Sequence, residues 1–409
     1  MKKLSLVVLA SLFAVLPISA QQSDAALRHV ISADSSSRNA DGKLQTLSAA
    51  EHLSRAEVYS SNRMFPQARE HWQKVFDNYP SDPGMAKALF GTARSYMWEK
   101  RYDKAVDWFE KLTQNYLNTK DGREGLAFKG ASLVRLGKNV EAAKVYEQYT
   151  QKFPQGERVE SSYLNIIDAY REAGKFDEAN RWIDKTVSVF AGKPAAVNAL
   201  HARLRLAIYR ENWPEAIQAA DRMLASGGFA GSMTGTDEVK YLKAFALERS
   251  GRRAEASSLY AAIPRNVNSY FGGLAAEKAA GSQIQLTSRV TPGLYSDYPV
   301  MYRSELLRSA LARKVDPRFV LAIMKQESSF RPGAKSLAGA RGLIQLVYDT
   351  AVKYNKKAGY PNLQPDDLYE PEVNIAVGSA YIAGLKDEFG GLYEAIAASY
   401  NGGEDNAGR

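Results

Sequence analysis

The sequence predicts an all-α protein in which a long helical solenoid is followed by a second helical domain. Apolar residues recur at intervals of three and four along most of the chain, which is typical of helices packed through one face. Beyond about residue 300, the repeated phrase of the solenoid no longer occurs, and a new series of capped helices begins. The solenoid itself is predicted by alanines at intervals of 37, 37, 37, 37 and 40 residues, namely Ala68, Ala105, Ala142, Ala179, Ala216 and Ala256.

The first residues have the layout of a secretory signal peptide. A basic start, Met1–Lys3, precedes a short apolar run from Leu4 to Leu16, and small residues lead up to Ala20. We therefore expect residues 1–20 to be removed and the protein to be exported. The apolar run is too short to span a bilayer comfortably, so we expect no transmembrane segment in the mature chain.

The composition narrows the classes of function. The chain has no cysteine, which excludes disulfides, thiolate metal sites and a cysteine nucleophile. The net charge is +9, or +7 without Lys2 and Lys3, and residues 296–409 hold 14 basic and 14 acidic residues, so the surplus lies upstream. A basic surface suits an anionic polymer. Because export is expected, we expect no nucleic acid as a partner.

Two segments of different composition follow the predicted signal peptide, residues 21–45 and residues 46–280. The first segment is rich in Ser, Asp and Ala with few large apolar residues, which predicts a flexible or weakly helical leader. The second holds the repeats. Each repeated phrase, such as Tyr102–Ala105 or Phe176–Ala179, is expected to begin the second helix of a hairpin, and its small alanine lets two helices cross closely. The first helix of three hairpins should end at Gly137, Gly174 and Gly251.

These hairpins are similar to tetratricopeptide repeats of slightly extended period. A stacked repeat buries one face on its neighbour, so we expect the repeat aromatics to be core residues rather than a platform for sugars. The aromatics concerned are Trp108, Phe109, Tyr146, Trp182 and Tyr260. The surface of such a solenoid can also recruit other proteins.

The four histidines, His29, His52, His71 and His201, all precede the second domain. No pair of them has the spacing of metal ligands, so the sequence predicts no metal site and no cofactor. Residues 281–299 contain Gly281, Pro292, Gly293 and Pro299 and are expected to be a linker. The second domain then covers residues 300–409.

Glu327 is the candidate catalytic residue. Asp316 followed by Pro317 predicts the start of a helix. Val320, Ile323 and Met324 form one apolar face, and Glu327 continues that face at the end of the helix. An acid placed there loses water while a ligand can still reach it, and this favours its protonated form.

A glycine-spaced loop from Ser336 to Gln345 follows this helix and lets backbone approach a ligand closely. Three motifs here resemble those of the soluble lytic transglycosylases, whose catalytic domain is lysozyme-like. They are Gln326–Phe330 for the family's Glu-Ser motif, Gly339–Gln345 for its Gly-Leu-Met-Gln motif and Ser399–Gly403 for its Ala-Tyr-Asn motif. The resemblance implies that Ser336, Gln345, Tyr400 and Asn401 position glycan or tune Glu327, with backbone around Leu343 and Ile344 contacting acetamido groups.

The resemblance also implies a reaction with a single acid. Ordinary glycosidases need a second carboxylate, about 5 Å away or farther. We interpret the acids of the second domain that could supply one as surface charges: Asp349, Asp366, Asp367, Glu370 and Glu372. The family cleaves the β-1,4 bond between N-acetylmuramic acid and N-acetylglucosamine in peptidoglycan and leaves a 1,6-anhydromuramoyl end. A periplasmic location is implied with it.

Two alternatives remain open at this point: a lysozyme-type hydrolase of the same bond, and a non-catalytic scaffold that binds cell wall through its repeats. The chain departs from the family at Leu346–Tyr348, Ser399 and Gly403–Glu404, and members of the family continue beyond the position of Arg409 with further helices. We therefore expect the second domain to be truncated at its C-terminus.

Overall fold

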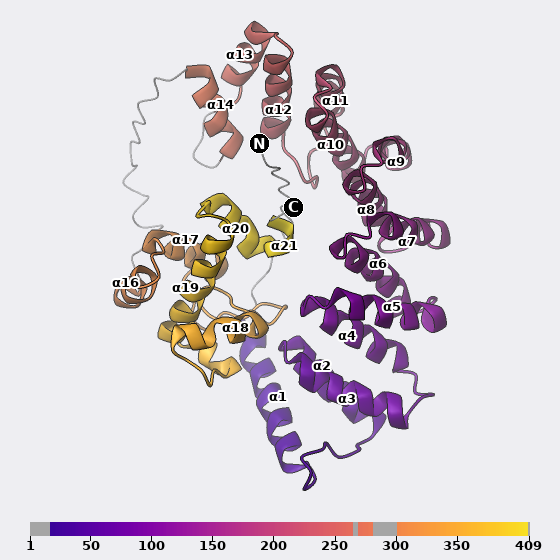
Figure 1. Ribbon diagram of the computed structural model, residues 1–409, viewed down its shortest axis with the longest axis vertical. Helices are drawn as coiled ribbons and strands as arrows, with labels where there is room; N and C mark the ends of the chain where they lie inside the picture. Colours follow the sequence, from indigo (N-terminus) through magenta and orange to yellow (C-terminus); the bar gives the residue numbers. More distant parts are fainter. Residues whose placement is uncertain (1–16, 265–268, 281–300, 408–409) are drawn as a thin grey trace. The chain divides into compact units, whose positions relative to one another are not determined.

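The computed structural model describes residues 17–264, 269–280 and 301–407, and these residues form helices and no strand (Figure 1). The predicted all-α fold class is confirmed. The chain divides into two compact units, Met1–Trp108 together with Val290–Arg409, and Phe109–Arg289. Most of the predicted signal peptide and the predicted linker lie outside the described residues. No helix in the described ranges is both long enough and apolar enough to cross a membrane.

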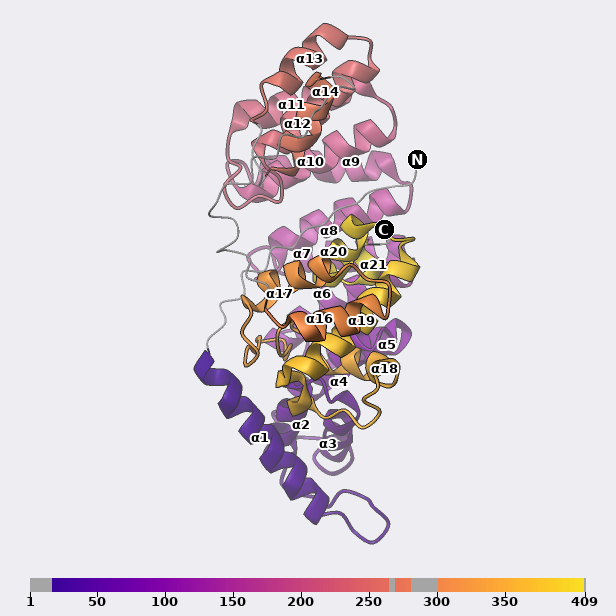
Figure 2. The same cartoon turned by 90° about the vertical axis from the view of Figure 1, so that its left-hand side faces the viewer.

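The repeats form consecutive helical hairpins, and in the second unit the helices from α6 onward follow one another in chain order (Figures 1 and 2). Their bounds are α2 Ala49–Ser61, α3 Phe65–Asn78, α4 Met85–Trp98, α5 Tyr102–Tyr116, α6 Lys120–Arg135, α7 Asn139–Lys152, α8 Val159–Glu172, α9 Phe176–Val189, α10 Pro194–Tyr209, α11 Trp213–Ser226, α12 Thr236–Arg249, α13 Arg253–Ala261 and α14 Tyr270–Ala280.

The repeated phrases lie where the sequence predicted. The helices α3, α5, α7, α9, α11 and α13 each begin at the first residue of a phrase. The six phrase alanines are at most 2% exposed, since each lies where a neighbouring helix packs closely. Gly137, Gly174 and Gly251 have φ angles of 72°, 70° and 86°, a conformation that glycine adopts without strain and that ends a helix.

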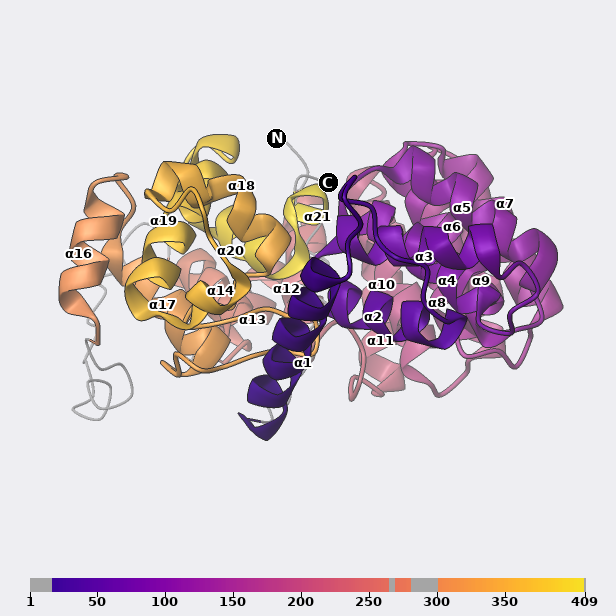
Figure 3. The same ribbon diagram turned by 90° about the horizontal axis from the view of Figure 1, so that it is seen from below.

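The amino-terminal segment, for which the sequence predicted a flexible or weakly helical leader, is helical in the structure. Helix α1, Pro17–Ser36, covers much of residues 21–45 (Figure 3). Its residues Leu27 and Val30 are 1% and 7% exposed. Asp24 and Asp34 are also buried, at 3% each. The segment has few large apolar residues. Its buried carboxylates Asp24 and Asp34 instead form ion pairs with cationic side chains elsewhere in the first unit. Composition alone does not reveal such partners.

His52 and His71 form a hydrogen-bonded pair, which the sequence analysis did not identify. Their Nδ1 atoms lie 2.9 Å apart, and Nε2 of His71 lies 2.9 Å from a carboxylate oxygen of Asp34. The amide of Leu47 donates to Nε2 of His52. His52 therefore carries its proton on Nδ1 and donates it to His71, while His71 donates to Asp34. Each ring nitrogen is satisfied by this chain of hydrogen bonds.

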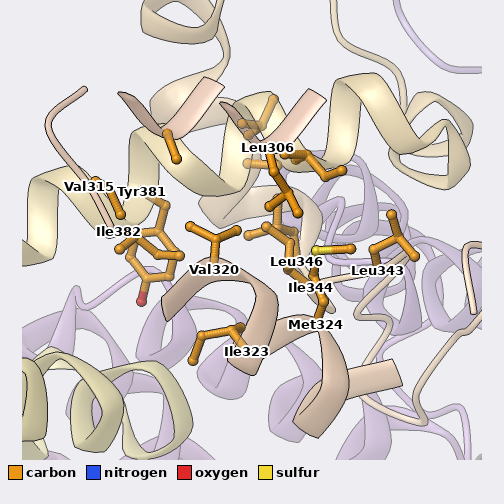
Figure 4. Packing of buried hydrophobic residues seen from close by; sticks show 14 of the residues in the cluster. Leu306, Val315, Val320, Ile323, Met324, Leu343, Ile344, Leu346, Tyr381 and Ile382 are labelled. Atoms are coloured by element: carbon orange, nitrogen blue, oxygen red, sulfur yellow. The ribbon is translucent and has the colours of Figure 1, made fainter. Parts of the chain in front are cut away.

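The C-terminal domain packs its helices around one apolar core (Figure 4). Val320, Ile323 and Met324 of α17 meet Leu343, Ile344 and Leu346 of the following loop and Tyr381 and Ile382 of α19. The helices of the domain are α16 Arg303–Leu311, α17 Pro317–Ser328, α18 Tyr348–Ala358, the short 3-10 helix η1 Pro365–Tyr369, α19 Pro371–Glu388, α20 Tyr393–Gly402 and α21 Glu404–Ala407. In α18, Val347 is the N-cap residue and Asp349 lies in the first turn.

Candidate active site

Helix α17 carries Glu327 on its last turn. The helix begins as predicted, since a side-chain oxygen of Asp316 accepts a 2.9 Å hydrogen bond from the amide of Arg318 and Pro317 takes the first position. Ser329 and Phe330 then have φ angles of 50° and 64°, which ends the helix abruptly. This left-handed turn leads the chain away from the helix directly after Glu327.

Glu327 is half-buried beside the apolar core of the domain. Burial raises the pKa of its carboxyl from 4.5 to about 7. Loss of water destabilises the carboxylate more than the neutral acid. A carboxylic acid in this setting keeps its proton near neutral pH and can donate it there.

Ser328, the neighbour of Glu327, ties the helix to the loop. Its hydroxyl is buried and donates a 2.6 Å hydrogen bond to the carbonyl of Leu343. On the opposite side of the loop, Tyr400 of α20 donates a 2.5 Å hydrogen bond to the carbonyl of Ile344. The loop backbone is therefore held between the helix that carries Glu327 and the helix that carries the third motif.

Asn374 of α19 is a further residue at the loop that the sequence analysis did not identify. Its side-chain oxygen accepts a 2.9 Å bond from the amide of Ile344, and its nitrogen donates to the carbonyls of Arg341, at 3.0 Å, and Leu368, at 2.8 Å. Asn374 is fully buried. A buried amide that satisfies three backbone groups fixes the course of a loop, but nothing in the local sequence distinguishes it from an exposed helical asparagine.

The glycines of the loop are needed for this geometry. Gly342 has a φ of 78°, and a Cβ atom at this position would lie 2.1 Å from the carbonyl oxygen of Leu368 and 2.2 Å from the side-chain nitrogen of Asn374. Gln345 also has a left-handed φ, of 48°, and its side-chain nitrogen donates to the carbonyls of Gly342, at 2.8 Å, and Ala334, at 3.1 Å. These two hydrogen bonds fix the orientation of the Gln345 side-chain amide.

Tyr400 differs in one respect from its expected role. Its hydroxyl donates to Ile344 rather than to the Glu327 carboxylate. Burial and then the charge of Glu327 raise the pKa of Tyr400 well above its usual value, so the two residues interact electrostatically. Tyr400 thus supports the loop directly and contributes to the surroundings of Glu327.

A pocket of about 270 Å³ lies beside these residues. Gln345, Tyr400 and Asn401 line one part of it, and Arg63 and Trp98 of the first repeats line another. The structure therefore brings together three of the predicted site residues. Glu327 is not in the wall of this pocket. Its charge acts on Tyr400, which is part of that wall.

Ser336, Leu343 and Ile344 lie elsewhere in the loop. The hydroxyl of Ser336 accepts a 3.1 Å bond from the amide of Ala340, so it stabilises the turn at the tip of the loop. The side chains of Leu343 and Ile344 are fully buried in the core. The carbonyls of both residues and the amide of Ile344 already have protein partners.

Among the acids considered as second carboxylates, Asp349 contradicts its interpretation as a surface charge. It lines the pocket, and its carboxylate lies 3.5 Å from Nε of Arg63, with 17% of its side chain exposed. Burial raises its pKa, and Arg63 acts against that rise. By contrast, Asp366 and Glu372 make exposed ion pairs, with Arg28 and Arg308.

The chemistry of the site is that of an acid and hydrogen-bonding groups. Within the ranges that the structure describes, no group of three or more His, Asp or Glu side chains is arranged to hold a metal ion. The pair formed by His52 and His71 belongs to the first repeat and is occupied by its own hydrogen bonds.

Comparison with known protein families matches two parts of the chain. Residues 306–409 match the family described as the transglycosylase SLT domain, and residues 53–116 match a tetratricopeptide repeat family. The C-terminal match covers the α17 helix, the loop and α20.

The curated relatives share the C-terminal part. The chain is 30% identical over 122 residues to the soluble lytic murein transglycosylase of Salmonella typhimurium, covering 30% of this chain and 19% of that protein. It is 40% identical over 110 residues to the membrane-bound lytic murein transglycosylase C of Yersinia pestis, covering 24% of this chain and 30% of that protein. The chain thus spans less than a third of the length of either relative.

Among solved structures, the chain is similar to the 70 kDa soluble lytic transglycosylase of Escherichia coli. The identity is 16% and the TM-score 0.43, with 96% of this chain and 80% of that chain covered.

Proposed function

Because this chain carries a transglycosylase SLT domain behind tetratricopeptide repeats, we propose that it is a lytic transglycosylase that cleaves peptidoglycan. The bond is the β-1,4 linkage between N-acetylmuramic acid and N-acetylglucosamine, and the product carries a 1,6-anhydromuramoyl end. The observation that carries this proposal is Glu327, an acid whose pKa burial raises to about 7 at the edge of a glycine-framed loop.

The proposed reaction uses Glu327 twice. Its protonated form donates to the glycosidic oxygen as the bond to C1 breaks. The 2-acetamido group of the substrate stabilises C1. The Glu327 carboxylate then accepts the proton of the C6 hydroxyl, whose oxygen closes the anhydro ring at C1. The acid is regenerated and no water is consumed, and the attacking group gains the advantage of being already part of the substrate.

The other site residues hold the substrate in this proposal. Gln345, Tyr400 and Asn401 line the pocket next to Glu327 and contact glycan. Ser336 shapes the tip of the loop, and the carbonyls of Leu343 and Ile344 hold the loop to Ser328 and Tyr400. We also propose that residues 1–20 direct export to the periplasm, where peptidoglycan is found, and that the solenoid surface can bind partner proteins.

The products of digestion test the proposal. Purified peptidoglycan is incubated with the protein and with the Glu327→Gln variant, and the muropeptides are analysed by mass spectrometry. The proposal predicts anhydro-ended muropeptides with the natural chain and none with the variant. Reducing ends would instead identify a hydrolase. Equal lysis by both proteins would reject Glu327 as the acid, and binding without lysis by both would leave the repeat scaffold as the function.

A further inference from the structure

A buried cluster of charges joins helix α1 to the loop of the candidate site. A carboxylate oxygen of Asp24 lies 2.7 Å from Nζ of Lys335 and 2.9 Å from Nη2 of Arg341. The side chains of Asp24, Lys335 and Arg341 are 4%, 6% and 0% exposed. One carboxylate is therefore shared by two cations in a place that water does not reach.

The remaining partners complete the cluster. Tyr369 donates a hydrogen bond to the other oxygen of Asp24, and Asn62 of the first hairpin accepts from both Lys335 and Arg341. Burial acts to raise the pKa of Asp24, but the hydrogen bonds from Lys335 and Tyr369 and the charge of Arg341 outweigh it and lower that pKa below its usual value. Asp24 is thus ionised, and it contacts both cations at hydrogen-bond distance.

The two cations enclose the tip of the loop. Lys335 and Arg341 lie on either side of residues 336–340, and the backbone of Arg341 exchanges hydrogen bonds of 2.9 and 3.0 Å with Leu346. Gly342 to Gln345 lie between those two residues. At the tip, the side chain of Leu337 is 86% exposed, whereas those of Lys335 and Arg341 at its two ends are buried. The buried cluster around Asp24 therefore holds both ends of the tip.

We propose that Asp24 is a positioning residue of the active site: by holding Lys335 and Arg341 from helix α1, it keeps the loop that carries Ile344 and Gln345 in its place next to Glu327. The amino-terminal helix is then part of the catalytic apparatus, although Asp24 and Lys335 are 311 positions apart in the chain. This proposal rests on the function proposed above, but its structural half can be tested without any turnover.

The chain offers a matched control. Arg28, one turn after Asp24 on α1, pairs with Asp366 of the same domain at 2.6 Å, but the two side chains are 57% and 42% exposed. An exposed ion pair contributes little, whereas removing one partner of a buried pair leaves uncompensated charge. Asp24→Asn removes the buried charge that Lys335 and Arg341 share, and Arg28→Ala removes one exposed ion pair between the same helix and the same domain, so very different effects are expected.

The test measures three properties of the full chain for Asp24→Asn, Arg28→Ala, Lys335→Met and the double variant Asp24→Asn with Lys335→Met. Hydrogen exchange followed by mass spectrometry reports on residues 333–346. The folded fraction is measured by thermal unfolding. The kcat and KM for purified glycan strands are then expressed per folded molecule, over pH 5 to 9, a range of roughly two pH steps on either side of the expected Glu327 midpoint.

We expect Asp24→Asn to lose protection in residues 333–346 and to lose activity per folded molecule by about 10- to 100-fold, as displaced positioning groups do. The alkaline limb of its pH profile should move to lower pH, because a loosened loop lets water reach Glu327. Lys335→Met should lose less activity and less protection, since Asp24 then still pairs with Arg341. The double variant should recover part of the loss, and Arg28→Ala should match the natural chain.

The proposal is overturned if Asp24→Asn and Arg28→Ala show the same exchange in residues 333–346, or if the activity lost by Asp24→Asn is fully explained by its unfolded fraction. If the natural chain proves inactive on peptidoglycan, the proposed function fails. The exchange measurement then still decides whether Asp24 orders the loop.

Discussion

The hydroxyl of Tyr400 donates a 2.5 Å hydrogen bond to the backbone carbonyl of Ile344. This contact links the third sequence motif to the second, across 56 positions of the chain. It holds the phenol ring at the wall of the pocket. It also holds the loop at Ile344, the residue after Leu343, whose carbonyl accepts a hydrogen bond from Ser328.

Tyr400→Phe removes that hydrogen bond and leaves the Ile344 carbonyl without its partner. We expect a loss of about 1–2 kcal/mol in the free energy of unfolding, as for other buried hydrogen bonds. We expect a fall in kcat/KM of roughly tenfold, which corresponds to about 1.4 kcal/mol of lost positioning. Chemical denaturation and steady-state lysis measure both. Tyr393→Phe, an exposed position on the same helix, is the control, and an equal effect of the two variants would contradict the assignment.

Gly342→Ala should disrupt the loop. The new Cβ would meet the Leu368 carbonyl and the Asn374 amide inside van der Waals distance, on a backbone with a φ of 78°. We expect a destabilisation of about 3 kcal/mol or more together with loss of lysis. Gly359→Ala is the control, since its φ is 93° but a Cβ there meets no atom within 4 Å. The Gly359→Ala variant should be destabilised only by the strain of its positive φ, about 1–2 kcal/mol. Similar melting temperatures for the two variants would contradict this reading of the loop.

Asp349→Asn tests whether a second carboxylate takes part in the reaction. Asp349 lies in the pocket with a raised pKa, as a base or nucleophile of a hydrolase could. The proposed single-acid reaction predicts that activity per folded molecule stays within about threefold of the natural value. Because the substitution leaves Arg63 without its carboxylate, the double variant with Arg63→Gln is compared as well. A loss as deep as that of Glu327→Gln in both variants would favour the hydrolase.

The His52 and His71 pair should make the first repeat sensitive to acid. Burial, followed by the charge of His71, lowers the pKa of His52 to about 4. Burial also lowers the pKa of His71, against the opposing effect of Asp34. A base with a lowered folded pKa contributes stability that is present above its ordinary pKa of 6.5 and is lost as pH falls toward 4.

Amide exchange in α2 and α3 should therefore quicken between pH 6.5 and 4, after correction for the intrinsic rate. His52→Gln removes the titrating group and should flatten this dependence, whereas His29→Gln, at an exposed position, should leave it unchanged. The same pH dependence in all three proteins would contradict the assignment to this pair.

The sequence predicted the elements whose causes are local. The recurring alanine phrase fixed the start of six helices, because a small residue, a turn and an apolar face must occur together in each hairpin. Asp316 and Pro317 predicted the start of α17, and the apolar spacing predicted that Glu327 faces inward. The packed surroundings of Glu327 follow from that spacing and from the turn at Ser329.

What the sequence did not reveal depends on partners far along the chain. The acids of α1 favoured the prediction of a flexible or weakly helical leader. Lys335 and Arg341, the residues that bury Asp24, lie more than 300 positions away and could not be recognised as its partners. Asp349 was taken as a surface charge for the same reason, since Arg63 covers it from the first repeat. His52, His71 and Asn374 likewise have ordinary local surroundings, and only the fold brings their hydrogen-bond partners to them.

The titration of Glu327 tests the central claim most directly. A carboxyl with a pKa raised from 4.5 to about 7 makes the folded state less stable as pH rises through that interval. The natural chain and Glu327→Gln should then be equally stable below pH 4.5, and the variant should gain up to about 3 kcal/mol above pH 7. In the decisive measurement, the carboxyl carbon of Glu327 is followed by NMR against pH. The account predicts a midpoint of about 7, and a midpoint near 4.5 would contradict it.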